Sequence, residues 1–319
     1  MPPRILFVTS TRIGDAVLSS GILAHLVETR PEARFTIACG PAAASLFAGV
    51  PRLERVIVMA KGPYAAHWRR LWAACVGARW DAVIDLRRSA LAWTLCARQR
   101  LRLSGPSGLA HRVVENAGVL GLDPPPAPHL WTLPRHEEAA TRLIPAGGPV
   151  LAVGPTANWR GKTWRMENFV ELVARLTAPA APFAGARVAV FAAPGEDAAP
   201  LLDALPPERR LPVTGEADLL TVFAALKRCA FYVGNDSGLM HLAATAGAPT
   251  LGLFGPSREE HYAPWGPGCA VARTALAYDQ LVGGPGYDHR TTGTLMDSLS
   301  VEAAETAALA LISAVRGNR

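Results

Sequence analysis

The sequence lacks any long hydrophobic run. No apolar stretch reaches the roughly 20 residues that a membrane-spanning helix needs. The N-terminus, MPPRILFVTSTRIGD, contains only a four-residue apolar run, which suits a buried strand and is too short for the core of a signal peptide. We therefore expect a soluble, cytoplasmic protein that is at most peripheral to a membrane.

Cysteine is scarce as well. The chain has five cysteines, an odd number that is widely spaced and mostly set in apolar sequence. None belongs to a CxxC pair or to a zinc-ligand spacing, so the pattern argues against a disulfide framework and a zinc site and indicates reduced thiols. The residues are Cys39, Cys75, Cys96, Cys229 and Cys269.

Charge is sparse, with 18% charged residues against 50% hydrophobic residues. This balance argues against extended disorder and against a nucleic-acid-binding tail. The net charge is only +6, and much of the basic excess is arginine in the first half. These arginines favour an anionic substrate or an acidic membrane surface, although solvated helix faces explain them equally well. They are Arg69, Arg70, Arg87, Arg88, Arg98, Arg100, Arg102 and Arg112.

The alternation of short apolar runs with helical patterns predicts an α/β fold built from βαβ units with parallel sheets. A chain of 319 residues favours two domains. The expected strands of the first half are residues 5–8, 35–38, 56–59, 82–86 and 101–103. Those of the second half are residues 150–153, 187–193, 231–233 and 250–254.

A segment rich in proline and glycine, with one predicted helix over residues 135–143, separates the two halves. We place the boundary near Gly147, which gives domains at 1–147 and 148–319. Two such domains would face a central cleft, with ligands at the carboxyl ends of the strands. The final helix, 301–315, is expected to have a structural role only. The N-terminal domain is one surface on which it could pack.

Residues 154–164 read GPTANWRGKTW and end in a Gly-Lys-Thr typical of a P-loop. A P-loop needs G-x-x-x-x-G-K-[ST] between a strand and a helix. Here Thr156 occupies the first glycine position, the bulky Trp159 lies inside the loop, and the helical pattern starts only near Met166. The P-loop interpretation is therefore disfavoured. The hydroxyl and cationic side chains still suit phosphate oxygens, or else they form a basic surface loop.

Residues 231–256, FYVGNDSGLMHLAATAGAPTLGLFGP, predict a buried strand that leads into a helix beginning at Gly238. A helix N-terminus offers unpaired N–H groups and a positive dipole end, and glycine allows close approach, so this pattern favours a diphosphate site. Asp236 and Ser237 could instead be ordinary N-caps. His241, one turn into the helix, either lines the site or packs in the core.

The segment NDSGLMHLAATAGAPTLGLFGPS resembles the signature of the family 9 glycosyltransferases, the ADP-heptose:lipopolysaccharide heptosyltransferases. Three further segments resemble other parts of that family, and they follow in the family's order. These are RILFVTSTRIGDAVLSSGILAHL, DAVIDLRRS and GPTANWRGKTWRMENFVELVARL.

The resemblance implies a GT-B fold, in which two Rossmann-like domains bind the acceptor and the nucleotide-sugar donor respectively. It also implies an inverting displacement that needs neither a metal nor another cofactor. The chain contains no Asp-x-Asp pair of the kind that metal-dependent transferases use. Positive groups of the protein would then stabilise the departing diphosphate.

By match to the family's Gly-Asp, Asp15 is the expected general base that takes the proton from the acceptor hydroxyl. Gly14 would permit a tight turn before it. The alternative is that Asp15 is the N-cap of a helix over residues 16–28.

On the donor side, Lys162 matches the family's donor-loop lysine and would neutralise the leaving diphosphate. Thr156 and the N–H groups of Ser237 and Gly238 would assist it, and Glu196 would hold the ribose hydroxyls, unless it is only an acidic first-turn residue of its helix. The full donor-binding set is Gly14, Thr156, Lys162, Glu196, Asp236, Ser237, Gly238 and His241.

The sequence departs from the family pattern in two places, and both affect the assignment to a subfamily more than membership of the family. Thr156 is followed by Ala157 rather than by a second hydroxyl residue, and the C-terminal region lacks the cysteines of many members. The acceptor side has no fixed motif. Its candidate residues, for the carboxylates or phosphates of an inner core, are Arg12, Arg87, Arg88 and Arg112.

The leading hypothesis is transfer of a heptose from ADP-heptose to a lipid-linked, anionic lipopolysaccharide or related glycan. The reaction would take place at the cytoplasmic face of the inner membrane, and we expect no nucleic-acid partner. A first alternative keeps the fold and changes the sugar, as in another nucleotide-sugar transferase or a sugar-nucleotide epimerase. A second alternative is a P-loop NTPase or a non-catalytic nucleotide-binding module, which would require Mg²⁺-dependent ATP binding and Thr163.

Overall fold

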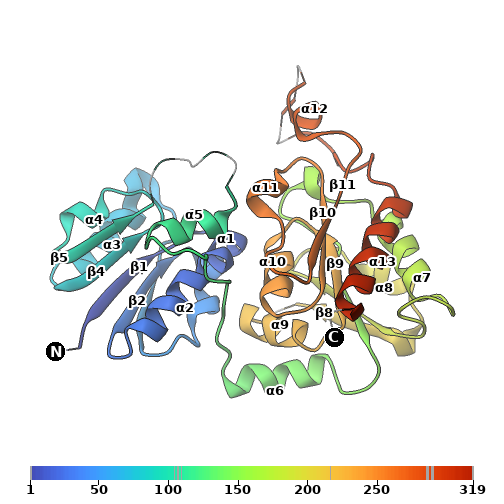
Figure 1. Ribbon diagram of the computed structural model, residues 1–319, viewed down its shortest axis with the longest axis horizontal. Coiled ribbons are helices and arrows are strands. Elements are labelled where there is room, and N and C mark those ends of the chain that lie inside the picture. Colours follow the sequence, from blue (N-terminus) through green and yellow to red (C-terminus); the bar gives the residue numbers. More distant parts are fainter. Residues whose placement is uncertain are drawn as a thin grey trace. The chain divides into compact units, whose positions relative to one another are not determined.

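The computed structural model describes residues 2–103, 105, 108, 110–215, 217–284, 287–288 and 291–317. The chain divides into two compact units, Met1–Leu133 (unit 1) and Pro134–Arg319 (unit 2). Each unit is an α/β structure around one parallel sheet, as the alternating pattern predicts (Figure 1). No helix among the described residues has the length and apolar character to cross a bilayer.

The sheet of unit 1 has the strand order β3-β2-β1-β4-β5. All four strand pairs are parallel, and Val8 at the end of β1 pairs with both Ala38 of β2 and Asp85 of β4. The carboxyl ends of the central strands are therefore level. The strands are β1 (Arg4–Val8), β2 (Arg34–Cys39), β3 (Leu53–Val58), β4 (Trp80–Asp85) and β5 (Ala97–Arg102).

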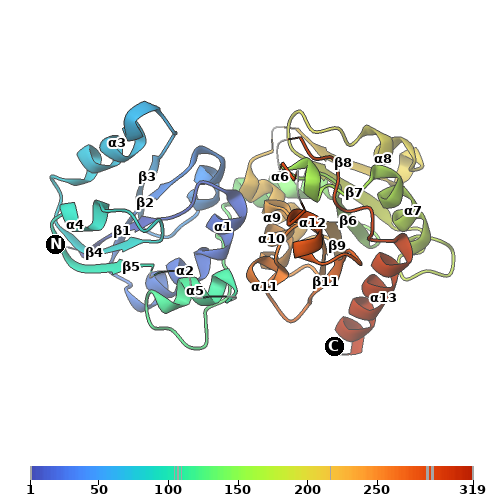
Figure 2. The same cartoon turned by 90° about the horizontal axis from the view of Figure 1, so that it is seen from above.

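Helices cover both faces of this sheet, because the central strands are apolar on both sides. One face carries α1 (Ile13–Leu18), α2 (Ser20–Thr29) and α5 (Arg112–Gly118), which contact one another. The other carries α3 (Ala66–Cys75) and α4 (Leu91–Thr94) (Figure 2). The short 3-10 turns η1 (Pro41–Phe47) and η2 (Pro63–Ala65) complete the unit.

The sheet of unit 2 has the order β11-β10-β9-β6-β7-β8 and is parallel throughout. Its strands are β6 (Val150–Gly154), β7 (Arg187–Ala192), β8 (Arg210–Thr214), β9 (Phe231–Asn235), β10 (Thr250–Phe254) and β11 (Cys269–Arg273). Its helices are α6 (Pro134–Leu143), α7 (Met166–Leu176), α8 (Ala199–Asp203), α9 (Leu219–Leu226), α10 (Gly238–Thr245), α11 (Glu259–Tyr262), α12 (Tyr278–Val282) and α13 (Val301–Gly317), with 3-10 turns η3 (Arg160–Lys162) and η4 (Pro207–Arg209).

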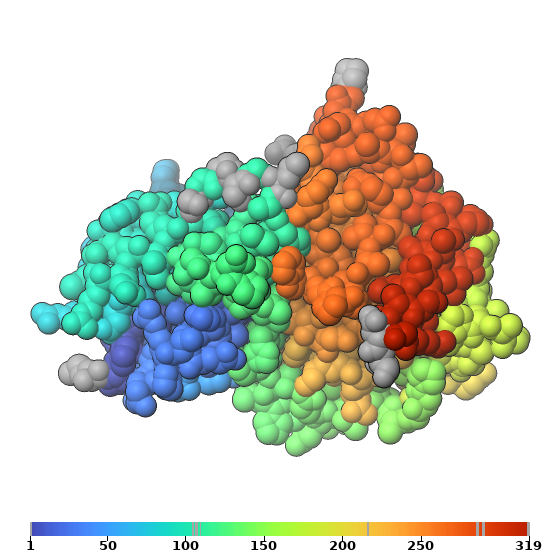
Figure 3. All heavy atoms as spheres, viewed as in Figure 1, coloured from blue at the N-terminus to red at the C-terminus, as the bar shows by residue number. Residues whose placement is uncertain are grey.

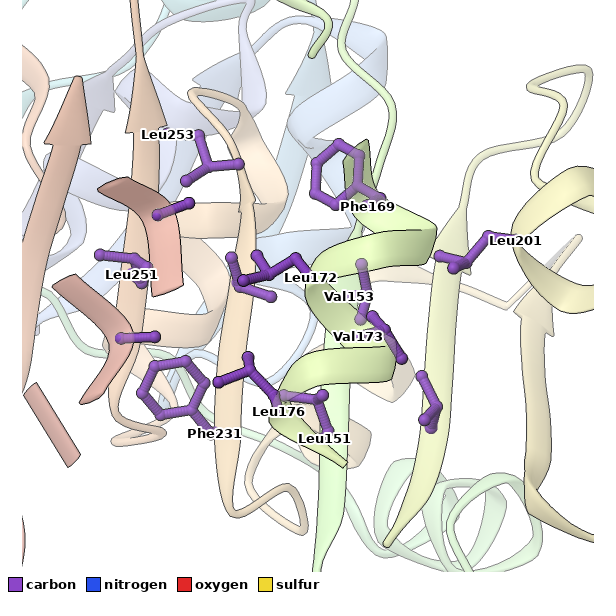
Figure 4. Close-up of a cluster of buried hydrophobic side chains, with 14 of the residues drawn as sticks. Leu151, Val153, Phe169, Leu172, Val173, Leu176, Leu201, Phe231, Leu251 and Leu253 are labelled. Atoms are coloured by element: carbon purple, nitrogen blue, oxygen red, sulfur yellow. The ribbon is translucent and has the colours of Figure 1, made fainter. Parts of the chain in front are cut away.

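A hydrophobic core of unit 2 lies between the sheet and α7. Alternate strand residues such as Leu151 and Val153 point to this face because side chains alternate along a strand, and they meet Phe169 and Leu172 of α7 (Figure 4). Burying each such side chain contributes about 1.5–3 kcal/mol. This packing holds α7, and with it the loop that precedes α7, against the sheet.

The last helix, α13, packs on α7, β10 and β11 of unit 2. Its buried residues, including Ala304 and Leu311, belong to the core of that unit, and Arg175 of α7 binds Glu302 and Glu305 of α13. Figure 3 shows α13 in red at the surface of unit 2. The final helix therefore packs within unit 2, because its apolar residues are buried in the core of that unit.

The division between the units falls after Leu133, whereas the sequence placed it near Gly147. The segment between these points contains α6, which packs on α9. Lys227 at the end of α9 binds Glu137 of α6 at 2.9 Å. The helix in the linker therefore lies with unit 2.

Every expected strand is present, and two strands were missed. Both missed strands, β8 (RLPVT) and β11 (CAVAR), lie at the edges of the unit 2 sheet. An edge strand is paired on one side only, so it tolerates the proline and charges that hid β8. All five cysteines are unpaired, as expected.

Candidate functional site

The candidate donor site lies at the carboxyl ends of β6, β7 and β9. β6 is the first strand of unit 2, and the next strands are added on opposite sides of it, β7 on one and β9 on the other. Strand order thus reverses at β6, and in such sheets the reversal is where ligands bind. Gly154 of β6 pairs with Gly234 of β9, so the loops that follow these strands start side by side.

Lys162 and Asp236 meet at this place. Lys162 ends the 3-10 turn η3 after β6, and Asp236 follows β9. The ammonium of Lys162 donates a hydrogen bond to Oδ2 of Asp236, forming an ion pair in which the Asp236 side chain is 5% and the Lys162 side chain 23% exposed. Two segments that the sequence separates by 74 positions therefore form one polar site.

The geometry excludes a P-loop. The Gly161–Thr163 segment is a 3-10 turn and its C-cap, and α7 begins only at Met166. A P-loop lysine stands at the start of its helix, which is not where Lys162 stands. The prediction that disfavoured a P-loop is consistent with this arrangement.

Asn235 anchors the loop that carries Lys162. Its side chain is fully buried. Its Oδ1 accepts a hydrogen bond from the backbone N–H of Trp164 at 3.0 Å, and its Nδ2 donates to the carbonyl of Pro155 at 2.8 Å. One amide therefore ties both ends of the loop to β9. This role of Asn235 was not predicted from the sequence, where its only signal is its position in the Asn-Asp-Ser run.

A second clamp comes from the segment before α13. The hydroxyl of Thr294 donates to the carbonyl of Thr163 at 2.6 Å, and the N–H of Leu295 donates to the carbonyl of Gly161 at 3.0 Å. The indole of Trp164 donates to the carbonyl of Leu299 at 2.9 Å. These contacts hold the Lys162 turn in addition to those of Asn235, so the lysine stands on a rigid support.

Thr156 and Glu196 are directly paired. The hydroxyl of Thr156 donates to Oε2 of Glu196, and the same oxygen accepts the N–H of Ala193 at 2.8 Å. The sequence assigned these two residues to separate parts of a donor, the phosphates and the ribose. The structure places them together where β6 and β7 end.

The N-terminus of α10 carries no side-chain cap. Ser237 is the N-cap residue, but its hydroxyl makes no capping bond, and Gly238 is the first helical residue. Asp236 bonds to Lys162 instead of capping the helix. The alternative that these two residues are ordinary N-caps is therefore not what the structure shows. His241, the fourth residue of α10, is buried.

Tyr232 occupies the space between the two paired glycines. A Cβ atom on Gly154 would lie 2.2 Å from the Tyr232 hydroxyl oxygen, and one on Gly234 would lie 2.3 Å from it. Burial raises the pKa of Tyr232, which keeps the phenol protonated. Tyr232 was not predicted as a site residue, because a tyrosine within an apolar strand pattern gives no separate signal in the sequence.

Asp15 lies in the first turn of α1 in unit 1. Arg12 is the N-cap residue of this helix, and the hydroxyl of Ser10 donates to Oδ2 of Asp15 at 3.4 Å. Asp15 is therefore not an N-cap. Gly14 lies inside α1, so its expected tight turn is wrong, because the helix begins one residue earlier, at Ile13.

Two of the acceptor candidates, Arg87 and Arg88, follow β4. Buried Asp85 organises this turn by accepting the N–H of Arg87 at 2.8 Å and both the N–H and the hydroxyl of Ser89 at 2.8 and 2.6 Å. The Arg87 guanidinium stands over the ring of Trp68, 5.3 Å from its centre. Since β1 and β4 are neighbouring parallel strands, these arginines lie at the same end of the sheet as Arg12 and Asp15, which follow β1.

Arg112 differs from the other acceptor candidates because it forms an ion pair with Glu115 within α5. Its charge is already partly neutralised there. Among the described residues no cluster of His, Cys, Asp and Glu is arranged to hold a metal ion.

Comparison with known proteins gives two kinds of similarity. Residues 109–279 match the model of "Glycosyltransferase family 9 (heptosyltransferase)". Lipooligosaccharide heptosyltransferase 2 of Haemophilus influenzae is 28% identical over 145 residues, covering 44% of this chain and 40% of that protein. Lipopolysaccharide heptosyltransferase 2 of Salmonella typhimurium is 27% identical over 168 residues, covering 49% and 47%. The matched segments thus span less than half the length of either relative.

Solved structures are similar along nearly the whole chain. A family 9 glycosyltransferase from Veillonella parvula superposes with a TM-score of 0.78 at 20% identity, covering 98% of this chain and 97% of that one. The E. coli ADP-heptose lipopolysaccharide heptosyltransferase II gives 0.75 at 18% identity, covering 99% and 100%. At these identities the likeness shows the fold alone, and the expected GT-B fold is confirmed.

Proposed function

Because the chain belongs to glycosyltransferase family 9, we propose that it transfers a heptose from ADP-heptose to a lipopolysaccharide inner-core or related glycan. The observation that carries this proposal is the meeting of Lys162 with Asp236 beside the uncapped N-terminus of α10. A cation and a helix N-terminus at a point of strand reversal suit a nucleoside diphosphate. Because the acceptor would be linked to a lipid, the enzyme would work at a membrane surface.

The diphosphate would lie at the N-terminus of α10, where Gly238 has no side chain and the N-cap residue Ser237 makes no side-chain capping bond. The ammonium of Lys162 has three donors, so it can keep Asp236 as a partner and still bind a phosphate oxygen. Its charge would then oppose the negative charge that develops as the diphosphate leaves. Fixed charges of this kind stabilise a transition state without having to reorganise.

Glu196 and Thr156 would change partners when the donor binds. In the structure the Thr156 hydroxyl donates to Glu196. Ribose hydroxyls that donate to Glu196 would replace that bond and release the Thr156 hydroxyl for a phosphate oxygen. The pair would thus link recognition of the ribose to recognition of the diphosphate.

Asp15 would act as the general base. Its carboxylate receives one long hydrogen bond from Ser10, which leaves acceptor capacity for the sugar hydroxyl that attacks the anomeric carbon. A single displacement on the face opposite the diphosphate inverts that carbon. Lys162 and the α10 N-terminus would supply the positive charge that metal-dependent transferases take from a metal ion.

The anionic groups of the acceptor would bind Arg12, Arg87 and Arg88 in unit 1. These arginines follow neighbouring strands of the sheet. Arginine forks suit carboxylates and phosphates. Arg112 would contribute after release from Glu115.

Calorimetry with ADP, UDP and GDP tests the proposal. We expect ADP to bind and the other two to bind at least about tenfold more weakly, which corresponds to about 1.4 kcal/mol. Lys162→Ala should weaken ADP binding, whereas Lys227→Ala, which removes an exposed lysine paired with Glu137, should not. Tighter binding of UDP or GDP would indicate that the donor is another nucleotide sugar and not ADP-heptose. Mg²⁺-dependent ATP binding would favour a nucleotide-binding module.

A further inference from the structure

Unit 1 carries a strongly basic stretch that the proposed chemistry uses only in part. Residues 55–114 contain eleven arginine and lysine residues and two aspartates, a net charge of +9, while the whole chain carries +6. The remaining residues are therefore slightly acidic overall. Both aspartates are engaged, since Asp85 organises the turn after β4 and Asp81 accepts from the backbone of Arg4.

The same stretch exposes apolar side chains. Of the eight large hydrophobic residues exposed in the described part of the chain, five fall between Val58 and Trp93. Tyr64 is 91%, Trp93 64% and Trp72 44% exposed. Tyr64 and the next residue, Ala65, both have left-handed backbone conformations, with φ of 50° and 54°, which are uncommon outside glycine. The chain thus holds an aromatic ring outward at the start of α3.

Helix α3 combines these two features on its outward side. Leu71 and Cys75 are buried against the sheet. Arg69, Trp72 and Val76 lie at positions i, i+3 and i+7 and are exposed, so they form one stripe. Helix α4 contacts α3 and carries Trp93, whose ring centre lies 5.7 Å from the guanidinium of Arg102 of β5. A solvated helix face would carry polar residues where this one carries tryptophan and valine.

We propose that this face of unit 1 binds the surface of a bilayer that contains anionic lipids. We term it the α3 surface and define it as Tyr64, Arg69, Arg70, Trp72, Val76 and Trp93. Aromatic side chains favour the boundary between headgroups and acyl chains, and arginines beside them attract anionic headgroups. A second copy of the chain is a poor occupant, because it would bring two basic surfaces together.

A hollow beside the α3 surface extends its basic character. It is lined by Arg4, Arg34, Arg52 and Arg55, with Glu54 as its one acidic residue. The guanidinium of Arg55 donates to the carbonyl of Ala74 in the last turn of α3 at 2.6 Å, so the hollow adjoins that helix. Lipid phosphates would meet positive charge there as well as along α3.

Vesicle flotation of the full chain tests this inference. We expect binding to vesicles of phosphatidylethanolamine and phosphatidylglycerol and little binding to vesicles of phosphatidylcholine. Raising the ionic strength from about 0.1 M to about 1 M should release the protein, because it shortens the Debye length from about 10 Å to about 3 Å.

Matched variants locate the surface. A basic residue near an anionic bilayer strengthens binding about fivefold, so Arg69→Gln with Arg70→Gln should weaken binding by about 25-fold. The control, Arg135→Gln with Arg142→Gln, removes two exposed arginines from α6 of unit 2 and should change binding less than about twofold. Trp72→Ser should weaken binding roughly tenfold, since binding scales with buried apolar area. Leu309→Ser, at an exposed site on α13, is its control.

Equal binding to both kinds of vesicle, or equal losses in the α6 control, would overturn the inference. So would a concentration-dependent dimer that Trp72→Ser abolishes, because the face would then be an interface between copies. Calorimetry with ADP on the same variants separates this inference from the proposed function. Failure of the parent protein to bind ADP would refute the donor site and leave the vesicle result intact.

Discussion

The two units hold their candidate site residues in different ways. In unit 2 the polar groups are bound to one another, with Lys162 on Asp236 and Thr156 on Glu196, and buried Asn235 fixes the loop between them. In unit 1 Asp15 has a single long bond to Ser10, and Arg12 is exposed. The candidate donor site is thus built in advance, while Asp15 and Arg12 on the proposed acceptor side keep hydrogen-bonding capacity.

This difference has a physical reason. A diphosphate is a small, constant group, so a rigid cradle can match it in advance and stabilise charge without reorganising. A glycan acceptor is large and variable, so residues with free hydrogen-bonding capacity can adapt to it. The account therefore predicts that changes in unit 2 alter donor binding and stability, whereas changes at Asp15 alter turnover alone.

The largest effect is expected for Asp15→Asn. Removal of a general base lowers kcat by about 10²–10⁴-fold, while the Kd for ADP should stay within about twofold because the asparagine leaves unit 2 untouched. Turnover with ADP-heptose and calorimetry with ADP measure the two quantities. Asp81→Asn, which alters a carboxylate that binds the backbone of Arg4, is the control in the same unit, and retained turnover in Asp15→Asn would remove the base assignment.

Lys162→Met should lower kcat by about 10²–10³-fold, as expected for loss of one group that stabilises the leaving diphosphate. It should also lower the Tm, because the Asp236 carboxylate is then buried without its cation. Adding Asp236→Asn should recover much of the Tm and none of the turnover. Recovery of turnover in the double variant would show that the ion pair matters for stability alone.

Buried thiols in the two units allow their stabilities to be compared directly. Burial raises the pKa of Cys39 in unit 1 and of Cys229 in unit 2 to about 12 in each case, so both react with iodoacetamide only when their unit opens. A ligand at 100 times its Kd stabilises the site that it binds by about 2.7 kcal/mol, or about 100-fold. ADP should therefore slow the labelling of Cys229 by up to that factor.

Labelling of Cys39 should stay unchanged in the same experiment, because ADP is proposed to bind unit 2. Cys96 is exposed and provides the reference for unhindered reaction. Protection of Cys39 in place of Cys229 would indicate that ADP binds unit 1, which contradicts the proposed donor site in unit 2.

The smallest effect is expected at Gly234. A Cβ atom there would lie 2.3 Å from the Tyr232 hydroxyl oxygen and 2.7 Å from the carbonyl oxygen of Gly154. Gly234→Ala should destabilise unit 2 by about 1–3 kcal/mol, which thermal unfolding would show as a lower Tm. Gly148→Ala is the control, since an added Cβ there meets no atom within 4 Å, and an equal Tm for both variants would contradict the tight packing around Tyr232.

The sequence predicted the parts of the fold that depend on local pattern. Continuous apolar runs such as residues 150–153 and 231–233 predicted the central strands, which are buried on both faces. Edge strands β8 and β11 were missed because they lack that burial. The position of α6 could not be predicted, since it depends on contacts with α9 that local pattern does not encode.

The candidate site shows the same limit. Lys162 and the Asp236–Gly238 segment were predicted from residue type, and the structure brings them together. The pairing of Thr156 with Glu196 and the tethering of the loop by Asn235 depend on which strands are neighbours, and the sequence analysis did not derive those contacts from strand order. Gly14 was misassigned because helix α1 starts one residue before it.

A crystal structure of the protein with ADP would show where the diphosphate binds. We expect it at the N-terminus of α10, with its oxygens within hydrogen-bond distance of the N–H groups of Ser237 and Gly238 and of the Lys162 ammonium. We also expect Glu196 to bind the ribose and the Thr156 hydroxyl to leave Glu196. A diphosphate bound away from Lys162 and α10 would refute the proposed donor site.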